Sequence, residues 1–276
     1  MAYIIRHEAD YDAEGGFRNN DNVMCYRRKA IKSGDILEIE IYPVYRSKNA
    51  PELKKLPSKE KYRRYNAKQS AKMCQRIINA NFGPQDLHVT CTYSGTELPE
   101  QEQCEKDMQN FIRRINRRRQ KEGLAPARYM YVIEGKTDED KRTRVHSHLI
   151  IEGGLDRDTI EALWRAGSQK GAPRGTCNAD RLQPGDMQLT ALATYLMKDP
   201  KGRKRWKPSK NLKKPEVYIS DTAIKRKHVA QLARGTVNPI DYWRKQYPGY
   251  VFRDMQIKTN QCLSGAAVIV QLQRRC

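Results

Sequence analysis

The segment RVHSHLII, residues 144–151, constrains the fold more than any other part of the chain. Side chains alternate between the two faces of a strand, so His146 and His148 project from one face while Val145, Ser147 and Leu149 project from the other. Two neighbouring imidazoles on one sheet face provide two ligands for a divalent metal ion. The segment therefore predicts a strand that carries half of a metal site.

The surrounding sequence predicts further strands and helices. Apolar periodicity and turn residues define the remaining elements. Strands are expected at 36–45, 87–93, 129–135 and 144–154, helices at 58–81, 100–121, 155–165, 187–198 and 222–234, a loop at 167–186, and a strand pair at the C-terminal end. The central order of strand, helix, strand, strand and helix is typical of an α+β fold, an antiparallel sheet with helices packed on one face.

Composition suggests three consecutive regions. Residues 1–75 form an N-terminal basic extension with a polar, loose start followed by a strand and a helix, and residues 76–200 form the central domain. Residues 201–276 begin with the tract KGRKRWKPSKNLKKP and form a C-terminal basic region. We expect the two outer regions to extend the central domain and the last one to contact DNA.

Net charge points to a polyanionic partner. The 276-residue chain has 53 Lys and Arg against 32 Asp and Glu, a formal net charge of +21, which favours nucleic acid. Its seven cysteines are odd in number and include no C-x-x-C pair, which fits a reducing cytoplasm. No apolar run approaches the roughly 20 residues of a membrane span. We therefore expect a soluble, intracellular protein.

Glu134 is the predicted third metal ligand. It ends the strand that pairs with the histidine strand, and an antiparallel neighbour can bring its carboxylate to the same face. Two imidazoles and one carboxylate suit Mn²⁺ or Mg²⁺ and leave positions for phosphate oxygens. The alternative is that Glu134 is a solvated hairpin residue.

The segment ALATYLMK, residues 191–198, carries the candidate catalytic pair Tyr195 and Lys198. On a helix Tyr195 lies about 110° from the centre of the apolar stripe, so it is not simply a core residue. A phenol is a weak nucleophile at neutral pH, so catalysis needs an aligned phosphate and charge neutralisation by the metal and by Lys198.

Residues 81–198 resemble the HUH endonuclease domain of rolling-circle replication initiators, in particular the single-tyrosine Rep proteins of phages and plasmids. The likeness consists of the TCTY strand (90–93), the histidine pair and the Y-x-x-K pair, in that order. It implies a ferredoxin-like or RRM-like sheet, a metal-dependent nickase and ligase, and a bacterial host cytoplasm. Ser147 departs from the family, because the residue between the histidines is normally hydrophobic.

The implied mechanism is a transesterification at the replication origin. Tyr195 attacks a phosphorus and forms a 5′-phosphotyrosyl link, and the released 3′-hydroxyl primes synthesis by a host polymerase. A later 3′-hydroxyl can reverse the step and rejoin the strand. The chain lacks G-x-x-x-x-G-K-[ST], so unwinding is left to a host helicase.

Single-stranded DNA, including an origin hairpin, is the expected substrate. Basic residues neutralise phosphates, and aromatic rings stack on unpaired bases. The candidate DNA-binding residues are Thr92, Tyr93, Arg113, Arg117, Lys204, Arg205 and Trp206. Two other readings stay open. One is a non-catalytic RRM-like nucleic-acid-binding protein or origin repressor, and the other is a relaxase or transposase of the same superfamily.

Overall fold

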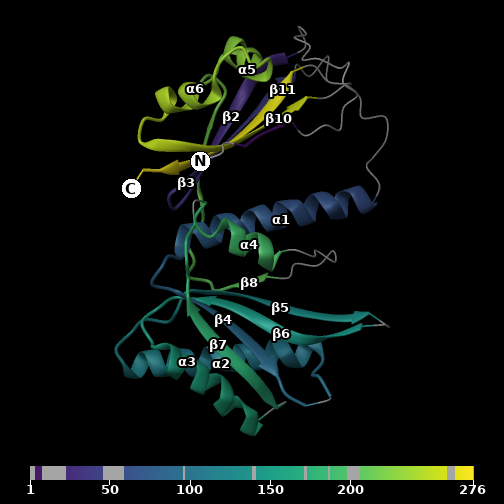
Figure 1. Ribbon diagram of the computed structural model, residues 1–276, viewed down its shortest axis with the longest axis vertical. Coiled ribbons are helices and arrows are strands. Elements are labelled where there is room, and N and C mark those ends of the chain that lie inside the picture. Colours follow the sequence, from purple (N-terminus) through teal and green to yellow (C-terminus); the bar gives the residue numbers. More distant parts are fainter. Residues whose placement is uncertain are drawn as a thin grey trace. The chain divides into compact units, whose positions relative to one another are not determined.

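The chain folds into two compact units in the computed structural model (Figure 1). One unit joins Met1–Ser58 to Lys214–Cys276, and the other comprises Lys59–Lys213. The structure describes residues 4–7, 23–45, 59–95, 97–138, 141–170, 173–185, 187–197, 206–259 and 265–275. This division differs from the three consecutive regions expected, because strands from both ends of the chain pair in one sheet.

The unit formed by the chain ends contains a six-stranded sheet in the order β1-β10-β11-β3-β2-β9. Neighbouring strands are antiparallel except β1 and β10, which are parallel. Its elements are β1 (Ile4–His7), β2 (Val23–Ser33), β3 (Ile36–Tyr45), β9 (Glu216–Ser220), α5 (Arg226–Ala233), α6 (Pro239–Gln246), β10 (Tyr250–Thr259) and β11 (Ala266–Arg274). Helices α5 and α6 pack on the apolar face of the sheet, where Val229 and Trp243 enter the core.

The central unit contains a five-stranded antiparallel sheet in the order β7-β4-β6-β5-β8. Its elements are α1 (Lys59–Asn81), β4 (Leu87–Tyr93), α2 (Gln101–Lys121), β5 (Tyr129–Asp138), β6 (Lys141–Ile151), α3 (Arg157–Arg165), the 3-10 helix η2 (Ala166–Lys170), β7 (Arg174–Arg181), α4 (Thr190–Leu196) and β8 (Trp206–Pro208). The predicted α+β class is confirmed.

Helices cover both faces of the central sheet, not one face as expected (Figure 1). On one face, α2 and α3 pack against residues such as Val89 and Leu149. On the other face, α1 and α4 pack against residues such as Val132 and Ile150. Because Leu149 and Ile150 are adjacent in β6, strand alternation sends them to opposite cores. The second layer of helices lies on the face that carries His146 and His148.

The predicted 167–186 loop contains a strand. Residues 174–181 form β7, which pairs with β4 at the edge of the sheet. The sequence RGTCNADR lacks the run of β-branched and aromatic residues that predicts a strand, and only Arg174 and Ala179 are buried in it. At the other end of the chain, Ile4–His7 forms β1, so the expected loose terminus includes a strand. No helix among the described residues is long and apolar enough to cross a membrane.

Candidate active site

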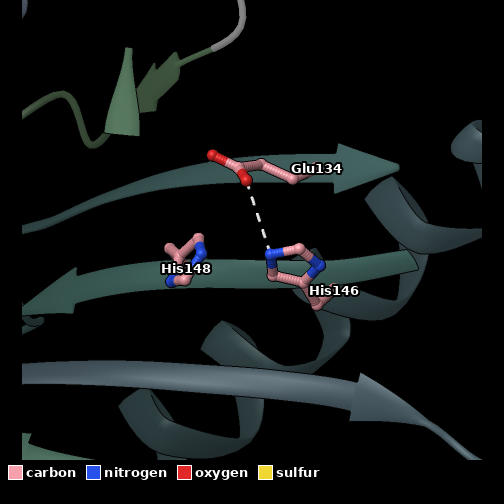
Figure 2. Close-up of side chains that lie close together, drawn as sticks. All are labelled: Glu134, His146 and His148. Carbon is pink, nitrogen blue, oxygen red and sulfur yellow. Dashed lines mark ion pairs between the residues drawn. The ribbon is translucent and has the colours of Figure 1, made fainter. Parts of the chain in front are cut away.

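Three predicted metal ligands meet on two neighbouring strands (Figure 2). Glu134 on β5 lies directly opposite His146 on β6, and His148 follows two residues later on the same face. The Glu134 Oε2 atom lies 3.4 Å from His146 Nε2. One ligand atom from each of the three residues lies within 4.8 Å of the others. Ser147 is fully buried on the opposite side of the strand, as the alternation predicted.

His148 offers a nitrogen that the protein leaves without a partner. Its Nε2 atom is buried and makes no hydrogen bond in the described part of the chain, and the residue is only 4% exposed. Desolvation by burial lowers the pKa of His148 to about 4, and nearby His88 also contributes. A neutral imidazole keeps one lone pair for a metal ion. The three residues therefore fit a divalent cation, but they do not identify which one.

Tyr195 lies on α4 beside the histidines. Its ring packs edge-on against His148, with 5.6 Å between the ring centroids and 79° between the planes. The side chain is 50% exposed, which confirms that Tyr195 is not a core residue. A DNA backbone can therefore reach the phenol from solvent, next to the candidate metal ligands. Lys198 lies outside the described residues.

Helix α1 holds the start of the tyrosine helix. Leu189, the residue before α4, has no side chain that can cap the helix, and its backbone N–H donates instead to Asn79 Oδ1 at 3.0 Å. Asn79 Nδ2 donates to Thr190 Oγ1 at 3.2 Å, and Gln75 Nε2 donates to the same oxygen at 3.0 Å. An unpaired N–H at a helix start is normally satisfied from within the helix terminus. Here a neighbouring helix satisfies it.

Two aromatic residues predicted to stack on DNA bases are buried, so that expectation is wrong for both. Tyr93 is 1% exposed, and its hydroxyl donates to Asp107 Oδ2 at 3.2 Å. Trp206 is 5% exposed, and its indole Nε1 donates to Ser70 Oγ at 2.9 Å. Strand alternation turns Tyr93 toward the α2 side of the sheet, and Trp206 fills the core under α1 and α4.

The other predicted DNA-binding residues are distributed over different surfaces. Thr92 lies opposite His146, and its Oγ1 contacts Thr176 Oγ1 at 3.0 Å. Arg113 and Arg117 are exposed on α2 and line a groove of about 460 Å³. The groove residues are Arg113, Asn116, Arg117, Gln120, Leu124 and Pro126. Because α2 covers the opposite face of the sheet, the groove does not adjoin the metal ligands. Lys204 and Arg205 lie outside the described residues.

Sequence reasoning missed a third histidine in the site. His88 on β4 lies with its Nε2 atom 3.1 Å from His148 Nδ1. Burial lowers the pKa of His88, opposed by the charge of Asp180. The signal was present in LHVTCTY, because strand alternation places His88 on the same face as Thr90 and Thr92. The sequence could not show that this face also receives the histidines of β6.

The comparisons agree with a role in DNA replication. Residues 86–200 match a family model described as a replication-associated protein of the ORF2 type. This range is less than half of the chain, but it includes Glu134, both β6 histidines and Tyr195. Neither the search of curated proteins nor the search of solved structures found a match. The central unit is thus similar to replication-associated, Rep-type proteins.

Proposed function

We propose that this chain is a rolling-circle replication initiator that nicks single-stranded origin DNA by tyrosine transesterification and later rejoins the strand. The observation that carries the proposal is the contact between the half-exposed Tyr195 and His148, within one cluster of candidate metal ligands. The family match supports a replication role in general terms. The chemistry itself rests on the site.

Each residue of the site has a distinct role. Glu134, His146 and His148 would hold Mn²⁺ or Mg²⁺, and such an ion supplies positive charge that stabilises a reacting phosphodiester. The Tyr195 oxygen forms a bond to phosphorus while the bond from phosphorus to the 3′-oxygen breaks. The phenol loses its proton, and the departing 3′-oxygen gains one. Lys198, by its likeness to the Y-x-x-K pair, would contact the phosphate.

The same bond exchange makes the reaction reversible. A phosphotyrosyl ester replaces a phosphodiester, so one ester bond is exchanged for another. A 3′-hydroxyl can then attack the 5′-phosphotyrosyl link and release the tyrosine. The free 3′-hydroxyl in the nicked state would serve a host polymerase, with strand separation by a host helicase. The proposed setting is the cytoplasm of a bacterial host.

DNA flanking the cut would bind away from the metal ligands. Arg113 and Arg117 line the α2 groove together with uncharged residues, so the groove offers positive charge without an acidic side chain in its lining. Phosphates favour such a surface through counterion release. Lys204 and Arg205 would add charge from the basic tract that precedes β8. Thr92 would line the strand path on the histidine face.

A covalent-adduct assay tests the proposal. The protein is mixed with end-labelled single-stranded origin DNA and Mn²⁺, and the products are separated under denaturing conditions. We expect a labelled protein band that disappears with EDTA and with Tyr195→Phe. Tyr65→Phe is a matched control, because Tyr65 is also an exposed helical tyrosine, at 59% against 50% for Tyr195.

The alternative assignments give different results in the same assay. If Tyr195→Phe still forms the adduct, another residue is the nucleophile and our assignment is wrong. If the wild-type protein binds the DNA but forms no adduct at any Mn²⁺ concentration, the chain is a binding protein or repressor. Loss of adduct in Tyr65→Phe as well would indicate a general effect on folding, which circular dichroism of both variants would reveal.

A further inference from the structure

We propose that His88 is a positioning residue that fixes the tautomer and ring orientation of His148, so that Nε2 of His148 faces the metal site. The inference rests on the proposed metal site and adds a residue to it. His88 would not bind the ion itself. It would act through the ring nitrogen of His148 that lies away from the ion.

Register in the sheet brings the two rings together. Thr90 is the direct partner of His148 on β4, and His88 pairs with Ile150, so His88 occupies the diagonal position. Diagonal neighbours lie within reach of large side chains on a sheet face. The two imidazole planes differ by 22° and their centroids lie 5.2 Å apart. This arrangement brings His88 Nε2 to 3.1 Å from His148 Nδ1.

A hydrogen bond between these nitrogens requires one proton and one lone pair. If His148 Nδ1 carries the proton, it donates to His88 Nε2, and His148 Nε2 keeps a lone pair that points into the ligand cluster. If His148 Nε2 carries the proton instead, a buried N–H has no acceptor among the described residues. A buried unsatisfied donor costs about 1–3 kcal/mol. The surroundings therefore favour the tautomer that can bind metal.

Thr90 provides a second, weaker acceptor for the same proton. Its Oγ1 lies 3.3 Å from His148 Nδ1, compared with 3.1 Å for His88 Nε2. A hydroxyl rotates freely and can donate as well as accept, so it does not by itself decide where the proton lies. The stacked His88 ring is fixed in place and accepts through one nitrogen. We therefore assign the tautomer mainly to His88 and a supporting contact to Thr90.

Residues that hydrogen-bond to metal-binding histidines have measurable effects on affinity. Their removal typically weakens metal binding by about 10- to 100-fold. His88→Phe keeps an aromatic ring on the strand but removes the acceptor. His88→Gln shortens the side chain but retains an amide oxygen that can accept. His228→Phe is the matched control, because His228 belongs to the other unit and packs edge-on against Tyr242 there.

Calorimetric titration of full-length protein with Mn²⁺ provides the first readout. We expect His88→Phe to weaken Mn²⁺ binding by about 10- to 100-fold. We expect His88→Gln to recover at least half of that loss on a logarithmic scale, and His228→Phe to match the wild type. Equal affinities in the wild type and in His88→Phe would overturn the role of His88. Failure of the wild type to bind Mn²⁺ would instead refute the metal site itself.

Nitrogen NMR of the metal-free protein provides the second readout, which a purely structural role would not alter. The chain has five histidines, so their ring signals can be assigned by substitution. We expect His148 to be protonated at Nδ1 in the wild type and to give mixed tautomer signals in His88→Phe. His148 protonated at Nε2 in the wild type would overturn the proposal, even if His88→Phe were too unstable for titration.

Discussion

Replacing Asn79 with alanine should loosen the helix that carries Tyr195 while the rest of the central unit stays folded. Helix α4 has only seven residues, Thr190–Leu196, and helices of that length are not stable in isolation. Its first N–H groups depend on α1. Asn79 accepts from the Leu189 N–H at 3.0 Å and donates to Thr190 Oγ1 at 3.2 Å.

The size of the effect follows from these two contacts. Leu189 is 2% exposed, so water does not readily replace the lost acceptor for its N–H. An unsatisfied buried donor costs about 1–3 kcal/mol. The contact with Thr190 adds little, because Gln75 donates to the same oxygen. We therefore expect Asn79→Ala to lower the free energy of local opening of α4 by about 2 kcal/mol, which corresponds to about 30-fold faster amide exchange.

Hydrogen exchange followed by mass spectrometry measures this opening in peptides that span residues 187–197. Asn81→Ala is the control, because Asn81 is equally buried on α1 but bonds to the backbone of Lys213 instead of α4. Exchange in α4 should accelerate in Asn79→Ala and not in Asn81→Ala. Equal acceleration in both variants, or none in either, would refute the idea that Asn79 holds the tyrosine helix.

Three further predictions concern pH, salt and the buried aromatics. The metal-free protein should lose stability as pH falls from 6.5 toward 4, because burial lowers the pKa of His148 from 6.5 to about 4 and the unfolded chain then binds more protons. Urea unfolding should show a flatter slope in this window for His148→Gln, and an unchanged slope would contradict the assignment. Removing both Arg113 and Arg117 should lower the salt slope of DNA binding by about two, whereas Arg118→Ala, whose guanidinium pairs with Glu122, should change it less. Tyr93→Phe should cost about 1 kcal/mol of stability through the lost bond to Asp107 without weakening DNA binding, and weaker binding would restore Tyr93 as a DNA contact.

The elements that position the site were accessible from sequence because their patterns are regular. Alternation in RVHSHLII and the hairpin before it places His146, His148 and Glu134 on one face, and the structure confirms that register. The helical phase of Tyr195 relative to the apolar stripe correctly indicates an exposed side chain. Both inferences depend only on local periodicity and on one antiparallel pairing.

Other features depend on contacts between distant segments, which one sequence does not encode in a readable form. Strands β1, β2 and β3 pair with β9, β10 and β11 from the other end of the chain, so the two expected extensions form a single unit. The contact between His88 and His148 needs the register of β4 against β6. Tyr93 and Trp206 were assigned to DNA from residue type alone, and their burial depends on which helices cover each face.

The central claim is spatial, and a crystal grown with Mn²⁺ tests it most directly by anomalous diffraction. The account predicts one strong anomalous peak between the Glu134 carboxylate, His146 and Nε2 of His148, on the side of the sheet where Tyr195 packs. His148→Ala crystals under the same conditions should lose the peak. No peak at this cluster in the wild-type crystal, with Mn²⁺ bound elsewhere or not at all, would contradict the account.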